Sequence, residues 1–566
     1  MTATTPVPAG LLDHAAPADF TAGSRASPAR RSEVIFTRAW RPLAAICALQ
    51  AGLSLSLVWS NTAFGDEAWY LWLGRLAIGH WLHGAPWPTQ EEHISGSAFI
   101  YPPLGAAVSY LGGLAAARIL SLAFMVAATV LLYLAASRLI GRSGALCAAV
   151  IWALSEPVMR GAFATFDPMS VFLTTLSGYL VVQAGGVRLD RPKRLLLVLA
   201  AGLALAIANA TAYSGLVIDP AVIAFAFLVW QLDASPLRAA RDAALFGGVL
   251  AAGFPLALIV AHSTAGVSSI FRRSHSDHQS LLLVAGDVWK FSGLVIVLAI
   301  IGGGVALLNE DRRRAMLLAF LGCSILVVPA AQFYFQTGWA LDKHLAYGIW
   351  FAAIAAGYGC TALLGWLPGA GKRLVVACGV LALTFPAVSN WQLAWGQFHT
   401  WADGSSFIAA FRQAAAGTNG LIFASGQQHA AEYYTPQGDR WHVWSAAGLS
   451  LHPTFPRASW PRYYATTLNS GTYSVIAVFY HTTFSATPSL SGNLLLKSHV
   501  ARRYQKLVAL VGSNSGQPGL PVLTLALEKN KQYELVGVGP FNITNLSGSR
   551  DYGVYAIWKL NPAGKK

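Results

Sequence analysis

Asp66 and Glu67 form a pair of adjacent carboxylates just after the first long apolar segment of the chain. The pair lies between the end of that segment, at about residue 60, and the aromatic run Trp69–Trp72. A chain that leaves a bilayer here places both acids near the membrane face, because tryptophan and tyrosine gather at headgroup level. Acids at membrane depth are costly and are therefore functional candidates. A free Asp, with a pKa of about 3.9, is ionised at neutral pH and can act as a general base on a hydroxyl.

Asp167 is a further candidate acid, within the segment Ala164–Pro168. Because Pro168 follows it, the same residues also match a helix start, with Asp as the N-cap and Pro at the first helical position. Capping and catalysis are compatible in one carboxylate. For each of these acids the ordinary alternative is a solvated loop charge.

Asp342, Lys343 and His344 precede a late apolar segment. Lys343 would either extend its amine toward the headgroups or pair with Asp342. The alternative is that Lys343 contacts a phosphate group. The sequence leaves both interpretations open.

The sequence contains no convincing motif for a metal site or for a phosphate-binding loop. His275, Asp277 and His278 loosely resemble a metal-ligand group, but Arg272 and Arg273 beside them would repel a cation. We expect neither a metal nor a cofactor.

The glycine run 302–304 lies inside an apolar segment and lacks the strand and the lysine of a phosphate-binding loop. It favours close helix packing instead. The five cysteines all fall in apolar segments, without the spacing of a disulfide framework or a zinc site.

The composition identifies the class of protein. Of 566 residues, 55% are hydrophobic and 11% are charged, whereas soluble domains carry roughly 25% charged residues. The chain is therefore an integral membrane protein. Its formal net charge of +15 needs no nucleic acid, because basic clusters at 25–41, 188–194 and 312–314 are those that the positive-inside rule places in the cytoplasm.

Apolar segments of about 20 residues, enough to cross a bilayer, recur from about residue 42 to about residue 390. With the N-terminus inside, about eleven such segments place Asp66, Asp167 and the C-terminal part of the chain outside. The segments lie at about 42–60, 115–138, 143–160, 168–186, 195–211, 214–231, 243–262, 288–308, 315–335, 344–366 and 374–390.

The long outer loop 61–114 contains aromatic, amphipathic stretches, which often lie along the membrane interface. Within it, the two prolines of Tyr101–Leu104 disfavour a helix running through them.

The chain divides into three parts. Residues 1–40, rich in Ala, Pro, Thr and Arg, predict a disordered cytoplasmic tail. Residues 41–390 form an α-helical polytopic membrane domain. Residues 391–566 alternate short β-type runs with Gly, Pro, Asn and Ser clusters, which predicts an extracytoplasmic α/β domain, with strands at 420–424 and 536–539.

Taken in order, these motifs resemble the GT-C superfamily of polyprenyl-phosphate-sugar-dependent glycosyltransferases, especially the branch of protein O-mannosyltransferases and lipid A aminoarabinose transferases. The likeness covers about residues 42–390. It rests on the Asp66–Glu67 pair, on Pro102–Leu104, on Arg118–Ser121 and on Ala164–Pro168.

The resemblance implies roles for the candidate residues. Asp66, with Glu67 beside it, would be the base or the acceptor-positioning acid, and Asp167 the acid of the second outer loop. Members that modify lipid A carry a lysine directly before the proline segment, in contact with the donor phosphate, and this chain has Tyr101 in that place. By similarity to a basic residue near a late span, Lys343 or His344 would supply the positive charge.

We therefore predict a glycosyltransferase of the bacterial inner membrane. It would transfer a sugar from a polyprenyl-phosphate donor to a hydroxyl of an extracytoplasmic glycan, lipid or protein. A polytopic transporter or flippase is the alternative, and it predicts ionisable residues at midplane between repeated halves. Acids are scarce deep inside the predicted spans and no internal repeat is visible. A sensor with an outer ligand-binding domain would need no acidic pair at the interface.

Overall fold

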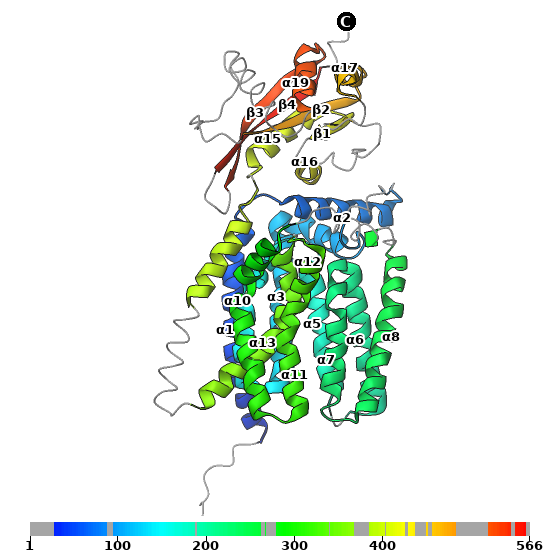
Figure 1. Cartoon of the computed structure of the whole chain (residues 1–566). Helices are drawn as coiled ribbons and strands as arrows, with labels where there is room; N and C mark the ends of the chain where they lie inside the picture. Colours follow the sequence, from blue (N-terminus) through cyan, green and yellow to red (C-terminus); the bar gives the residue numbers. More distant parts are fainter. Residues whose placement is uncertain are drawn as a thin grey trace, which may run out of the picture.

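The computed structural model shows a bundle of long helices with a small sheet domain above one end (Figure 1). Helix α2 lies across that end of the bundle, between the two parts (Figure 1). The structure describes residues 28–85, 87, 94–186, 189–261, 266–267, 279–338, 340–366, 384–401, 403–424, 428–435, 449–450, 456–482, 519–544 and 550–561.

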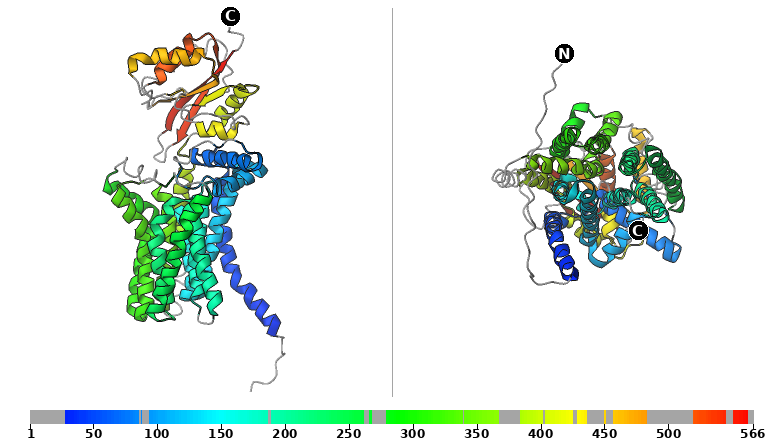
Figure 2. Two further views of the ribbon diagram at one scale, coloured as in Figure 1. Left: turned by 90° about the vertical axis from the view of Figure 1, so that its right-hand side faces the viewer. Right: turned by 90° about the horizontal axis from the view of Figure 1, so that it is seen from below.

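Within the described residues, eight segments are long and apolar enough to cross a membrane, judged by length and composition. Figure 2 shows that they pack roughly side by side, with α1 (Pro28–Val58) extending beyond the rest at its N-terminal end. The segments are Trp40–Val58 of α1, α3 (Tyr101–Ala153), α6 (Arg191–Thr211), Tyr213–Trp230 with α7 (Asp219–Trp230), α8 (Pro236–Val260), α10 (Leu281–Asn309), Arg312–Phe335 with α11 (Arg312–Cys323) and α12 (Val327–Phe335), and α13 (Leu341–Gly365).

These helices match the predicted spans closely, because apolar length is a local property of the sequence. α5 (Asp167–Ala184) covers a further predicted span although it is not among the eight. Residues 28–40, within the predicted tail, belong to helix α1. The predicted span at 374–390 falls mostly outside the described residues, as do His275, Asp277 and His278.

Helix α3 begins at the proline segment, inside the predicted outer loop. Pro102 and Pro103 stand in its first turn, where a missing backbone N–H costs no hydrogen bond and the fixed φ suits a helix. The prolines therefore start a helix, and no helix runs through them from the preceding residues. α3 is interrupted at Gly113 (φ 65°) and at Gly141 (φ 79°), and Gly141 lies between the two spans predicted as a hairpin.

The bundle core depends on close backbone contact between α10 and α13. A Cβ added to Gly302 would lie 1.9 Å from the carbonyl oxygen of Ala355. Only glycine allows this approach, which confirms the predicted packing role of the glycine run. α13 is buried along most of its length, so it forms the centre of the bundle.

Helix α2 (Gly65–His83) and the start of α3 form a platform at the end of the bundle. Their contact is also tight, because a Cβ on Gly74 would meet the carbonyl oxygen of Pro102 at 1.9 Å. Leu71 and Trp72 of α2 are buried, whereas Trp81 is 55% exposed. This arrangement fits the predicted helix along the membrane interface.

The C-terminal domain is a layered α/β structure, as predicted. Its sheet has the order β1-β2-β4-β3, with β1 (Leu421–Ala424) parallel to β2 (Tyr473–Thr482). β4 (Arg550–Leu560) is antiparallel to both β2 and β3 (Tyr533–Thr544).

Helices cover both faces of this sheet. On one face α15 (Ser405–Ala415) packs Phe407 and Phe411 against Phe479 and Tyr555. On the other face lie α17 (Trp460–Asn469) and α19 (Leu520–Lys529).

The short helix α16 (Gln428–Tyr434) joins the sheet domain to α2. The hydroxyl of Tyr434 accepts a hydrogen bond from the backbone N–H of Ala63 at 2.8 Å. Arg75 of α2 donates to the carbonyl of Tyr433 at 2.7 Å, and its guanidinium lies 4.5 Å from the centre of the Tyr433 ring. The two domains therefore meet at the loop that precedes Asp66.

Candidate active site

A cleft opens where α2, α5 and α13 begin. Four charged residues line it: Asp66, Arg160, Asp167 and Lys343. The rest of the wall is mostly apolar, with Phe64, Met125, Pro157, Gly161, Phe163, Thr165, Pro168, Val171 and Ala346. The cleft therefore combines carboxylates and cations in an apolar setting, which strengthens electrostatic effects on a bound group.

Asp66 and Glu67 point in different directions because they are neighbours on a helix, about 100° apart at 3.6 residues per turn. Asp66 lines the cleft. Glu67 is fully buried on the interior side of α2.

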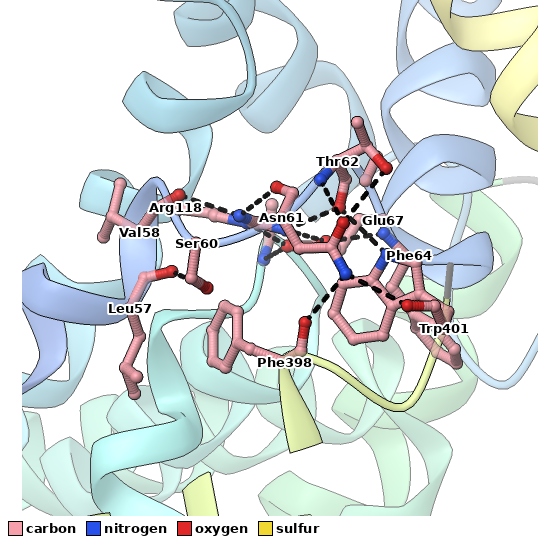
Figure 3. A network of polar contacts seen from close by, with 12 residues as sticks. Leu57, Val58, Ser60, Asn61, Thr62, Phe64, Glu67, Arg118, Phe398 and Trp401 are labelled. Atoms are coloured by element: carbon pink, nitrogen blue, oxygen red, sulfur yellow. Dashed lines mark hydrogen bonds and ion pairs between the residues drawn. The ribbon is translucent and has the colours of Figure 1, made fainter. Parts of the chain in front are cut away.

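Both carboxylate oxygens of Glu67 accept hydrogen bonds within a buried network (Figure 3). Arg118 donates to both of its oxygens, from Nε to Oε1 at 2.8 Å and from Nη2 to Oε2 at 2.7 Å. The backbone N–H groups of Phe64 and Ala164 donate to the same carboxylate at 2.9 Å and 2.8 Å. The structure thus does not bring Glu67 to the cleft wall, and both its oxygens are already occupied.

Arg118 extends this network to the end of α1 (Figure 3). It donates to the carbonyls of Val58 at 2.7 Å, Asn61 at 3.0 Å and Thr62 at 3.1 Å. A fully buried guanidinium with all its donors used holds these segments in one geometry. The network therefore fixes the loop and the first turn of α2 that carry Asp66.

The segment 384–401, which leads into the C-terminal domain and is called the stem below, contacts the same loop (Figure 3). Asn61 donates to the carbonyls of Phe398 and Trp401, each at 3.1 Å, and the Trp401 indole donates to the carbonyl of Thr62 at 3.1 Å. The Arg118 guanidinium also lies 5.1 Å from the centre of the Phe398 ring. The loop before Asp66 is thus held from both the membrane side and the stem side.

Asp167 is held by the start of α13. Lys343 Nζ lies 3.0 Å from its Oδ2, and His344 Nε2 lies 3.6 Å from its Oδ1. Thr165 donates to Oδ2 at 3.1 Å. Burial alone would raise the pKa of Asp167, but Lys343 and His344 outweigh it and hold that pKa below its usual value. Asp167 is therefore a stable anion and a weak base.

A second ion pair joins the same elements: Arg160 pairs with Asp342. Lys343 therefore pairs with Asp167 and not with Asp342, which was one of the two ordinary explanations for its position. The two pairs join the start of α13 to Arg160 and to Asp167, the first residue of α5. They place two cations at the rim of the cleft beside Asp66.

Tyr101 stands directly before the proline segment, in the place where the lipid A branch carries its lysine. Its side chain is fully buried and its hydroxyl is 3.0 Å from Ser121 Oγ. It is not part of the cleft wall. Lys343 is in that wall, and His344 lies beside it against Asp167.

Sequence reasoning missed Arg160 and the role of Arg118. Each is isolated in an apolar stretch: Arg160 is the only Lys or Arg between Arg142 and Arg188, and Arg118 the only one between Arg75 and Arg138. Lone cations within apolar segments are costly and usually functional. The same rule, applied to Lys and Arg as well as to Asp and Glu, identifies both Arg118 and Arg160.

Known proteins were compared with the chain. Residues 106–261 match the family described as dolichyl-phosphate-mannose-protein mannosyltransferase. This range includes Arg118, Arg160 and Asp167. No curated protein sequence matches at a significant level.

Solved structures share the fold over most of the chain. ArnT from Cupriavidus metallidurans, bound to undecaprenyl phosphate, aligns with 90% of this chain and 97% of its own, with a TM-score of 0.52 and 13% identity. The apo oligosaccharyltransferase of Archaeoglobus fulgidus covers 90% of this chain and 74% of its own, with a TM-score of 0.51 and 13% identity. At such identity the likeness concerns the fold.

The structural matches and the family match agree with the order of the motifs. Together they confirm the resemblance to the GT-C superfamily: residues 106–261 match a mannosyltransferase family, and the chain shares the fold of solved structures of ArnT and of an oligosaccharyltransferase.

Proposed function

We propose that this protein transfers a sugar from a polyprenyl-phosphate donor to a hydroxyl on an acceptor at the outer face of the bacterial inner membrane. Asp66 is the general base. Arg160 and Lys343 bind the donor phosphate. The acceptor is a glycan, a lipid or a protein, and the C-terminal domain lies outside, above the cleft.

The observation that supports this proposal best is the shared cleft. One carboxylate, Asp66, and two cations, Arg160 and Lys343, line the same space. Transfer from a lipid phosphate to a hydroxyl requires both kinds of group. A solved structure of the same fold is described as bound to undecaprenyl phosphate, which fits a donor of this class.

The reaction follows from these groups. Asp66 takes the proton of the acceptor hydroxyl, and the freed oxygen forms a bond to the anomeric carbon of the sugar. The bond from that carbon to the phosphate oxygen breaks, and the electron pair leaves with the lipid phosphate. Arg160 and Lys343 stabilise the charge that develops there.

Asp167 and Asp342 act as positioning residues in this scheme. Each holds one of the two cations in the unliganded cleft. Cations that are fixed before the donor arrives need little reorganisation in the transition state. Asp167 itself, a weak base, is less suited than Asp66 to deprotonate the acceptor.

The test is to identify the product in cells. Membrane glycans, lipids and glycoproteins are compared by mass spectrometry in cells without the protein, with the wild type, with Asp66→Asn and with Asp233→Asn. Asp233 is exposed at the end of the bundle away from the cleft and provides the same loss of charge as a control.

We expect a glycosylated glycan, lipid or protein that is present with the wild type and with Asp233→Asn and absent from cells without the protein. Asp66→Asn should lower its formation by about 10²–10⁴, the usual contribution of a general base. Equal product from Asp66→Asn would remove Asp66 from this role. The absence of any product difference between wild type and empty cells would contradict the proposed reaction.

A further inference from the structure

Glu156 is a buried carboxylate that the mechanism above does not use. It opens the short helix α4 (Glu156–Met159) and is fully buried. Neither carboxylate oxygen has a hydrogen-bond partner in the described part of the chain. Burying a carboxylate without a hydrogen bond costs free energy of folding. Such a residue is therefore a candidate for a functional role.

Its position is between two cavities. Pro157, the next residue, lines the active-site cleft. Ser155, the preceding residue, lines a second cavity of about 710 Å³ between α10 and residues 385–390. Glu156 thus lies in the chain between a residue that lines the cleft and one that lines the second cavity.

Arg160 follows Glu156 by one helical turn. Arg160 and Lys290 of α10 are the cations that interact electrostatically with Glu156. From the start of α13, Asp342 pairs with Arg160, and Lys343 and His344 contact Asp167. Arg160 therefore pairs with Asp342 and also interacts with Glu156, while Asp167, Asp66 and Glu67 add further negative charge near it.

The charge of Glu156 can change near neutral pH. Burial raises its pKa to about 7, although Arg160 and Lys290 act in the opposite direction. Below this pH Glu156 is neutral, and above it Glu156 is an anion close to Arg160.

We infer that Glu156 is a positioning residue that controls how strongly Arg160 binds the donor phosphate. When Glu156 is neutral, the positive charge of Arg160 is available to a phosphate in the cleft. When Glu156 is ionised, it competes for that charge and holds the guanidinium back. This inference rests on the proposed donor site at Arg160.

The test measures binding of farnesyl methyl phosphate to the full chain in detergent micelles, from about pH 6 to about pH 8.5. This phosphodiester keeps one negative charge over the range, because it lacks the second ionisation of a monoester, with a pKa of about 6. The wild type should bind the probe about tenfold less tightly at the upper pH, a change of about 1.4 kcal/mol.

Glu156→Gln should bind tightly at both ends and lose most of this pH dependence. A slope that is common to both proteins belongs to groups other than Glu156. Glu310→Gln, the same change at the far end of α10, serves as the matched control and should behave as the wild type. Equal pH profiles for the wild type and Glu156→Gln would overturn the inference.

Infrared spectroscopy measures the protonation state of Glu156 in the absence of any ligand. The wild type should show the C=O band of a buried protonated carboxyl that fades as the pH rises through 7, and Glu156→Gln should lack that band. If Glu156→Gln does not fold, Glu156→Asp should shift the band and the binding profile. A wild type without the band at about pH 6 would overturn the inference. A wild type that shows the band but binds no probe would instead count against the proposed donor site.

Discussion

At the scale of residues, two neighbouring acids lie in different environments. Asp66 lines the cleft, and Glu67 is buried against Arg118. The difference follows from the turn of the helix between them. We therefore assign the chemistry to Asp66 and a positioning role to Glu67.

Glu67→Gln is predicted to lower stability strongly, because it leaves the buried charge of Arg118 without its anion. Breaking a buried ion pair by removing one partner costs about 3–5 kcal/mol. Thermal unfolding in detergent should show a clear fall in Tm, together with a partial loss of turnover. Asp66→Asn should lose turnover at an unchanged Tm. A normal Tm with abolished turnover in Glu67→Gln would instead give Glu67 a chemical role.

At the scale of elements, backbone contacts hold the helices that carry the cations. Lys343 stands in the first turn of α13, and Gly302 of α10 allows α13 to approach closely at Ala355. Because α13 supplies Lys343 and Asp342, its placement against α10 and α5 decides where the cleft cations lie. Packing in the middle of the bundle thus supports the geometry at its end.

Gly302→Ala is predicted to destabilise the bundle by about 1–3 kcal/mol, the usual cost of overpacking. The added Cβ would meet a backbone carbonyl at 1.9 Å, which cannot rotate away. Gly304→Ala is the matched control, since nothing lies within 4 Å of its Cβ. Thermal unfolding of both variants tests this. Equal Tm values for the two would contradict the close contact between α10 and α13.

At the scale of the whole molecule, the C-terminal domain is attached where the site is built. Tyr434 bonds to Ala63, and the stem residues Phe398 and Trp401 bond to Asn61 and Thr62. All of these contacts fall within the loop before Asp66. The C-terminal domain therefore holds the loop that carries the proposed base, and it lies above the cleft end of the bundle (Figure 1).

Tyr434→Phe is predicted to loosen this attachment. It removes the acceptor of the Ala63 N–H, at a cost of about 0.5–1.5 kcal/mol for a lost hydrogen bond. We expect faster proteolysis between the domains and a several-fold lower turnover. Tyr463→Phe makes the same change within the sheet domain, where the hydroxyl accepts from Ser450, and turnover should stay normal. If both variants retain full turnover and proteolytic resistance, the contact does not support the site.

Much of the site was visible in the sequence, but its pairings were not. The acids Asp66 and Asp167 and the cation Lys343 were identified because charged residues at the ends of apolar segments stand out locally. Tyr101 stands out by its position before a proline pair, and the structure buries it with its hydroxyl against Ser121. Arg160 belongs to no local motif, and only its isolation in an apolar stretch marks it.

The sequence by itself determined the membrane character, the positions of most helices and the α/β nature of the C-terminal domain, because apolar length and residue periodicity act over neighbouring residues. Only the tertiary structure decided which charges meet. Arg118 reaches Glu67 across 51 positions, and Lys343 reaches Asp167 from another helix. Such pairs depend on how helices rotate and cross, and that is set by side-chain packing throughout the bundle.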